Sequence, residues 1–191
     1  MNLKSCYYNC SPEYISQISD SLHSQVLDLI SRLPKRKTQA EINSDLWWLF
    51  TSMGWNYDSI PSSVGELVPS ELGIQADREQ TKNRNNRDLC LTTTILNTQW
   101  RSVFSNSYEG KLVQVEAQFG KVEAMFKDFC GFRIAYAEKR LALGIEIGLV
   151  DPPTYFAYGN NAIGRVANFD IAKNTLKTIG LNAPIWLVGI E

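Results

Sequence analysis

The chain has 191 residues, of which 44% are hydrophobic and 20% charged, and its formal net charge is −1. This size and composition are typical of one globular domain that buries a core without disulfides or structural metals. No apolar run approaches the roughly 18 residues of a membrane-spanning helix, and the near-neutral charge argues against a protein that coats nucleic acid through a uniformly basic surface.

The first part of the chain, residues 1–55, is predicted to be helical. The opening residues hold no apolar run of the kind found in signal peptides, so we expect a cytoplasmic protein. Apolar residues at three-and-four spacing predict a helix from Pro12 to Leu33, and a second helix from about Gln39 to Met53. The segment from Asn56 to Gly73 is rich in Pro, Ser and Gly, which favours a loop.

A polar segment then separates this helical part from the rest. Residues from Gln75 to Asp88 include several Arg, Lys and Asn side chains and no apolar periodicity. The composition predicts either an exposed loop or a mobile arm.

Residues 89–191 form the second part of the chain, where the pattern changes from helical to strand-rich. Strands are predicted at Leu91–Leu96 and Trp100–Phe104, followed by a turn at Asn106–Gly110 and a strand at Lys111–Phe119. In this last strand, apolar residues alternate with a polar set, Gln114, Glu116 and Gln118, which must share one face.

The end of the chain completes an α/β pattern. A buried apolar stripe predicts a helix from Lys121 to Arg140. Leu141–Val150 and Pro184–Ile190 are short apolar runs typical of buried strands, separated by the long polar region Asp151–Asn182. We therefore expect a single α/β domain over residues 1–191, with a mixed β-sheet flanked by helices.

Glu116 and Gln118 are the first candidates for chemistry. Metal-dependent phosphodiester hydrolysis needs carboxylate oxygens on a hard cation and a polar group that orients the attacking water. Neighbouring side chains on one face of a rigid strand meet that need. The alternative is that both residues lie on the solvated side of a half-exposed strand.

These residues also carry a resemblance. Glu116-Ala117-Gln118-Phe119 resembles the E-x-Q-F form of the PD-(D/E)xK motif in restriction endonucleases of the BglII/BstYI group, in which Gln replaces the usual Lys. Gly120 and the aromatic-rich helix after it extend the likeness. GIEIGLV (residues 144–150) and APIWLVGIE (residues 183–191) resemble later core strands of the same group, so the likeness covers roughly the last 85 residues.

The resemblance implies a restriction-endonuclease-like fold and a type II, site-specific deoxyribonuclease. Glu116 and the Ala117 carbonyl would bind Mg²⁺, and Gln118 would help to position water for attack on phosphorus. Cutting both strands of a palindrome implies a homodimer on double-stranded DNA. Related enzymes read sites with a GATC core, which is the specificity that the resemblance implies.

Several polar residues are candidates for DNA contact. Lys121 begins a predicted helix beside the motif and would approach base edges in the major groove, although a solvated lysine is the simpler alternative. The other candidates have the amide and guanidinium groups used on bases and phosphates, although Asn and Gly also make ordinary loops: Asn160, Asn161, Arg165, Arg84 and Arg87.

One expected carboxylate is absent. The family places an Asp nine residues before the motif's Glu, and this chain has Ser107 there, with Asn106 before it and Glu109 two residues on. Three explanations stay open: Glu109 takes the role as catalytic and metal-binding carboxylate, a change at Asn106 or Ser107 has inactivated the site, or the protein binds DNA without cutting it. Losing one of two carboxylates would weaken metal binding severely.

Two rival functions therefore accompany the endonuclease hypothesis. A catalytically inactive, sequence-specific DNA-binding protein would keep the fold and lose the metal-dependent cleavage. An interaction module would use the E-x-Q strand only structurally, and its basic segment around Arg87 would be a solvated loop.

Overall fold

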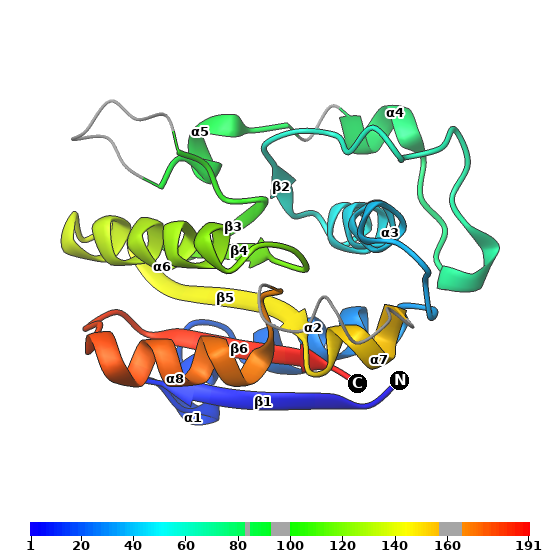
Figure 1. Cartoon of the computed structure of the whole chain (residues 1–191). Coiled ribbons are helices and arrows are strands. Elements are labelled where there is room, and N and C mark those ends of the chain that lie inside the picture. The colour runs from blue at the N-terminus through cyan, green and yellow to red at the C-terminus, as the bar shows by residue number, and fades with distance from the viewer. Residues whose placement is uncertain (83–84, 93–99, 157–165) are drawn as a thin grey trace.

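The protein forms one mixed sheet with helices on both faces (Figure 1). The computed structural model describes residues 1–82, 85–92, 100–156 and 166–191. Its six strands lie in the order β1-β6-β5-β4-β3-β2. They are β1 (Leu3–Tyr8), β2 (Asn56–Tyr57), β3 (Phe104–Tyr108), β4 (Lys111–Ala117), β5 (Leu141–Leu149) and β6 (Ile185–Ile190).

The helices are mostly short. They are α1 (Pro12–Ser16), α2 (Leu22–Ser31), α3 (Gln39–Ser52), the 3-10 turn η1 (Ser70–Leu72), α4 (Arg78–Lys82), α5 (Arg87–Cys90), α6 (Val122–Ala137), α7 (Pro152–Phe156) and α8 (Phe169–Ile179). No helix in the described ranges is long and apolar enough to cross a membrane.

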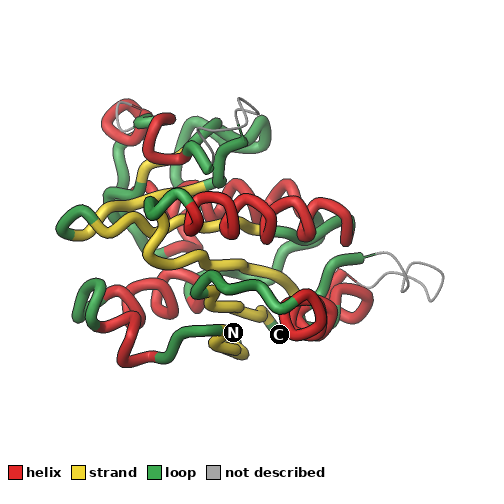
Figure 2. Tube along the Cα trace, turned by 90° about the vertical axis from the view of Figure 1, so that its left-hand side faces the viewer, coloured by secondary structure: helices red, strands yellow, loops and turns green. Residues whose placement is uncertain are grey.

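The strand pairing explains where the helices lie. β4 pairs with β5 in parallel, and β5 pairs with β6 in parallel, so α6 and α8 are the crossovers that such pairs require. β3 and β4 form an antiparallel hairpin, and β1 adds to β6 antiparallel. The first and last residues of the chain consequently lie side by side in both views (Figures 1 and 2). This arrangement confirms the predicted α/β mixed sheet.

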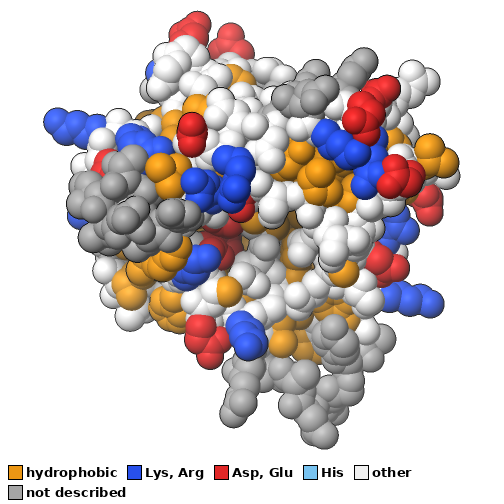
Figure 3. Space-filling view, turned by 90° about the horizontal axis from the view of Figure 1, so that it is seen from above, with side chains coloured by type: hydrophobic (Ala, Val, Ile, Leu, Met, Phe, Trp, Pro, Cys, Tyr) orange, Lys and Arg blue, Asp and Glu red, His pale blue; other side chains and the backbone are white. Residues whose placement is uncertain are grey.

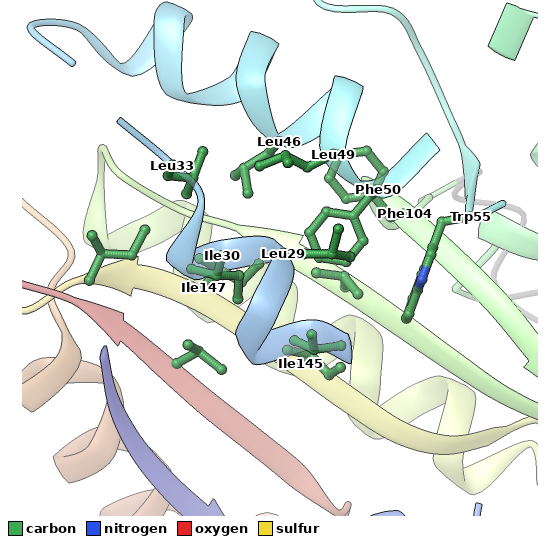
Figure 4. Close-up of a cluster of buried hydrophobic side chains, with 14 of the residues drawn as sticks. Leu29, Ile30, Leu33, Leu46, Leu49, Phe50, Trp55, Phe104, Ile145 and Ile147 are labelled. Atoms are coloured by element: carbon green, nitrogen blue, oxygen red, sulfur yellow. The ribbon is translucent and has the colours of Figure 1, made fainter. Parts of the chain in front are cut away.

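One face of the sheet is covered by an apolar core. Side chains from α2 and α3 point toward those of β3 and β5 (Figure 4). Phe50 of α3 stacks on Phe104 of β3 with ring centroids 4.6 Å apart. Val113 and Val115 of β4 belong to the same cluster, which confirms the apolar face predicted for that strand.

The other face is covered by α6 and α8, which lie in front of the strands in Figure 1. Two glycines let these helices approach. A Cβ on Gly144 would lie 2.7 Å from the Phe132 ring of α6, and one on Gly189 would lie 2.7 Å from Phe169 of α8. Both distances are shorter than a van der Waals contact. The helices can therefore pack this close to the strands only because Gly144 and Gly189 have no side chain.

Several boundaries differ from the sequence prediction. The helix expected from Pro12 to Leu33 is two helices, because the polar residues 19–21 favour a turn between them. The hairpin turn lies at Glu109 and Gly110, both with positive φ, so Asn106 and Ser107 belong to β3.

Other elements were not anticipated. The polar segment from Gln75 to Asp88 contains α4 and the start of α5, and the polar region from Asp151 to Asn182 contains α7 and α8. Strand β1 was also missed. The strand predicted at Leu91–Leu96 lies partly outside the described residues.

Candidate functional site

The polar side chains of β4 lie under α6 and not in solvent. Gln114 is fully buried, and its amide nitrogen donates to the carbonyl oxygens of residues 89, 90 and 91 at 3.1–3.3 Å. Glu116 is 8% exposed. The shared polar face predicted from the alternation is present, but the solvated alternative is wrong, because α5 and α6 cover this face.

Glu116 is held at the carboxyl end of β4. Its Oε2 accepts a hydrogen bond from the Val103 backbone N–H at 3.3 Å. Burial, and secondly the nearby Asp128 carboxyl, raise the pKa of Glu116 well above its ordinary value. A carboxylate that is buried beside another acid favours any positive charge that enters between them.

Gln118 is fixed in one orientation. Its backbone N–H donates to the Ile147 carbonyl at 2.8 Å, and its side-chain oxygen accepts from the Gly120 N–H at 3.0 Å. Its amide group also hydrogen-bonds the Asp128 carboxyl, which lowers the pKa of Asp128 against the larger effect of burial. Gln39 of α3 donates to the Phe119 carbonyl at 2.5 Å and fixes the chain just beyond the motif.

Two further buried acids complete a cluster that the sequence reasoning missed. Asp128 lies on α6, and burial raises its pKa to about 6. Glu146 lies on β5 directly opposite Glu116 in the parallel register. Burial, then Asp128 and Glu116, raise the pKa of Glu146 well above its ordinary value.

Both residues carried a signal in the sequence. Asp128 falls on the apolar stripe of its helix, three residues after Met125 and one before Phe129. Glu146 is the single acid in the apolar run Leu141–Leu149. A charged residue at a position that the pattern predicts to be buried is more informative than one on a polar face.

Asp58, directly after β2, is a fourth carboxyl residue near Glu116. Its backbone N–H donates to the Val103 carbonyl at 3.2 Å, so β2 continues for one residue beside the segment that holds Glu116. Its charge contributes to raising the pKa of Glu116. Asp58 also pairs with Arg87 at 3.0 Å and with Arg101 at 3.7 Å.

Cys90 is a buried thiol near Asp58 and Glu116. Burial raises the pKa of its thiol to about 11, and the charges of Asp58 and Glu116 act in the same direction. Its sulfur lies 3.2 Å from the Ser105 hydroxyl, and hard divalent cations prefer the oxygen donors beside it.

The structure corrects the hypothesis about Glu109. Glu109 is exposed in the hairpin turn, at the opposite end of β4 from Glu116, about 20 Å away at roughly 3.3 Å per residue. Ser107 pairs with Leu112 and is likewise remote from Glu116. Asn106 pairs with Val113 and is remote from it too. Glu109 therefore cannot share a cation with Glu116, and Asn106 and Ser107 do not face it, because the hairpin is longer than the family spacing suggested.

The structure describes the positions of only some of the residues predicted to contact DNA. Lys121 is exposed at the N-terminus of α6, beside the motif, and its backbone bridges to Val166. Arg87 is half-exposed and paired with Asp58. The remaining candidates lie outside the described residues: Arg84, Asn160, Asn161 and Arg165.

The donors suit a hard divalent cation in kind. Every acid in the cluster offers oxygen ligands, which Mg²⁺ prefers. Burial makes the ionised form of these acids unfavourable, and a bound cation would offset that effect. In the ranges that the structure describes, however, no three His, Cys, Asp or Glu side chains are gathered closely enough to hold a metal ion. Binding would therefore require the acid side chains to rotate toward one another.

The surface beside this cluster combines both charges. Figure 3 shows acidic side chains recessed into the face seen from above, with Lys and Arg side chains around them. Lys127 of α6 is the basic group that lowers the pKa of both Glu116 and Asp128. Its amine lies over the Trp100 ring, 5.4 Å from the ring centroid. A recessed acidic group with a basic rim suits a phosphate backbone and a cation together.

Comparison with known proteins finds similar solved structures but no similar sequence. No family model matches the chain, and no curated protein matches its sequence. Among solved structures, the crystal structure of restriction endonuclease BglII complexed with a DNA 16-mer superposes with a TM-score of 0.60 at 14% identity, covering 100% of this chain and 79% of that one. The protein therefore has a restriction-endonuclease-like α/β fold.

Proposed function

We propose that this protein is a type II restriction endonuclease that hydrolyses double-stranded DNA with Mg²⁺. The observation that carries the proposal is the pairing of buried Glu116 with an oriented Gln118 at the end of β4, on a fold that resembles a DNA-bound restriction enzyme. The proposed substrate is a short palindromic site, with a GATC core as the first sequence to test, and the active form is a cytoplasmic homodimer.

Glu116 and the Ala117 carbonyl would hold the Mg²⁺ ion, which supplies charge neutralisation at the phosphate and a more acidic water. Asp58 would supply the carboxylate that the hairpin lacks, since it contributes to the field at Glu116 and adjoins the same Val103 backbone. In this arrangement Arg87 and Arg101 would release Asp58 when the cation arrives, leaving two guanidinium groups close to the DNA phosphates.

Gln118 would act on the attacking water. Its carbonyl oxygen accepts from the Gly120 N–H and its amide group bonds Asp128, which leaves an amide N–H to donate to a new partner. It can thus donate to a water oxygen or to a phosphate oxygen, but it cannot remove a proton. The proton acceptor in this proposal is therefore a carboxylate of the cluster or a phosphate of the substrate.

DNA contacts would come from both sides of the site. Lys121 stands next to the motif, at the exposed start of α6. Arg87 stands on the β2 side. Arg84, Asn160, Asn161 and Arg165 remain candidates by residue type, and their alanine variants should weaken DNA binding if the prediction is correct.

The test is cleavage of unmethylated genomic DNA with Mg²⁺, with Mn²⁺ and with EDTA. We expect discrete fragments with either metal and none with EDTA. Glu116→Ala should lose activity by at least about 10³-fold, because it removes the carboxylate at the centre of the site. Glu109→Gln is the matched control, because it removes a carboxylate of the same kind far from the site and should cut like the wild type.

A catalytically inactive DNA-binding protein is the second candidate. The observation that favours it concerns Val103, directly before β3 of the hairpin, whose backbone N–H donates to Glu116. A valine side chain has no atom that could bind a cation, so the hairpin supplies no second carboxylate at this place. In that case the protein would retard a palindromic duplex in a gel, Glu116→Ala would bind equally well, and no condition would release fragments. Failure both to bind and to cut would leave the interaction-module hypothesis.

A further inference from the structure

Glu146 is the least explained side chain in the molecule. It is 4% exposed in the middle of β5, and in the described part of the chain neither of its carboxylate oxygens has a hydrogen-bond partner. A buried acceptor without a partner destabilises the folded state, and a charged one does so more strongly. Such a group calls for a physical explanation, and a bound ion or water is one that supplies the missing partners.

The sheet register places Glu146 in a defined environment. Glu116 and Glu146 are direct partners of the parallel β4–β5 pair, so their side chains leave the same face of adjacent strands about 4.8 Å apart. Asp128 approaches from α6, close enough to influence both pKa values. Asp128 on α6 thus lies near two acids of the sheet, although the three carboxyl groups do not converge on one point in the described structure.

Among the residues that the structure describes, no basic side chain compensates the charge of Glu146. Lys127 lowers the pKa of Glu116 and Asp128, whereas each electrostatic influence on Glu146 raises its pKa. A proton alone does not resolve this, because a neutral carboxyl group also needs a hydrogen-bond partner when it is buried. A divalent cation would satisfy both oxygens and reduce the repulsion among the three acids.

Glu146 lines a small pocket between the sheet and the helices, and most of its neighbours there are apolar. Gln118 and Asn168 are the polar residues of this lining, and Gly148 adds no side chain to it. In the described residues the acids are not gathered around an ion, so a shared cation requires the Glu146 and Glu116 side chains to turn toward each other across the strand pair.

We propose that Glu146 and Glu116 share a divalent cation, with Asp128 as the adjacent acid that Gln118 orients. This inference rests on the proposed function, since it deepens the same site: it adds a β5 carboxylate, which neither the E-x-Q motif nor the hairpin position supplies. The ligand class is a hard divalent cation, Mg²⁺ or Mn²⁺.

The test measures cation binding without DNA. Mn²⁺ would be titrated by isothermal calorimetry and electron paramagnetic resonance into the wild type, Glu146→Gln, Glu116→Gln and the control Glu109→Gln. We expect binding by the wild type and the control. Glu146→Gln should weaken binding by at least about tenfold, because one ligand charge is lost.

A second variant separates binding from folding. Glu146→Leu should raise Tm in EDTA by about 2–4 °C, since it removes a buried acceptor that has no partner, and should also lose Mn²⁺ affinity. Wild-type-like Mn²⁺ affinity in Glu146→Gln would overturn the inference, and so would a wild type that binds no Mn²⁺ at millimolar concentration.

The outcomes for cation and for DNA are independent. If Glu146→Gln loses Mn²⁺ but the wild type cuts no DNA, the shared cation stands and the endonuclease proposal fails. If the wild type cuts DNA and Glu146→Gln binds Mn²⁺ normally, the endonuclease stands and the role of Glu146 is rejected.

Discussion

The two faces of the central strands differ in the side chains that they bury, apolar on one face and polar or acidic on the other. On the α2/α3 face, β4 and β5 present Val113, Val115, Ile145 and Ile147 to an apolar core. On the α6 face, the intervening residues of the same strands include Gln114, Glu116 and Glu146, all buried. One face stabilises the fold, while the other holds groups whose burial is unfavourable unless they bind something.

The largest effect is expected on the apolar face. Phe50→Ala should reduce the free energy of unfolding by about 3–5 kcal/mol, because it leaves a cavity against Phe104 in a fully buried core. Urea unfolding measures this loss. Phe126→Ala on α6 is the control, since Phe126 is 41% exposed, and its effect should stay within about 0.5 kcal/mol. Equal losses in the two variants would contradict the division between the faces.

The close approach of α6 should give the next effect. Gly144→Ala should destabilise the protein by about 2–3 kcal/mol, because its Cβ meets the Phe132 ring at 2.7 Å. Gly148→Ala lies four residues on along the same strand, and its Cβ meets only a backbone oxygen at 3.4 Å, so it should be nearly neutral. Thermal unfolding of the pair is the measurement, and equal Tm values would show that α6 is free to shift.

The pH dependence of stability should be a smaller effect of the acidic face. The folded pKa of Asp128 is raised to about 6, above its unfolded value near ~3.9, so the folded state binds more protons between these values. This contribution to stability is present at low pH and is lost as pH rises through 6.

The comparison with Asp128→Asn isolates that contribution. In EDTA, the wild type should lose on the order of 1–2 kcal/mol relative to Asp128→Asn between pH 4 and pH 7. Urea unfolding at each pH measures the difference. If the difference in unfolding free energy between the two proteins stayed constant, or changed in favour of the wild type, burial would not raise the pKa of Asp128.

The smallest effect is expected at the hairpin turn. Glu109→Gln should change the free energy of unfolding by less than about 0.5 kcal/mol, because Glu109 is exposed. Measured by urea unfolding, a larger loss would show that the turn contributes to a second interface, for example between subunits.

The sequence by itself determined much of this protein. Apolar periodicity predicted α3, α6 and the strands β4, β5 and β6, because each of these elements buries one continuous face or run. The E-x-Q segment predicted Glu116 and Gln118 as candidate site residues, and the resemblance that it carries agrees with the fold. These features are local, so a short window of sequence holds them.

Only the tertiary structure decided which acids accompany Glu116. Asp58, Asp128 and Glu146 come from three other elements, and the sheet register and the crossing of α6 bring them together. The same register separates Glu109 from the site, although it is much nearer in sequence than Glu146 or Asp58. Strand pairing acts between residues far apart in the chain, and for that reason spacing along the sequence could not predict the composition of the site.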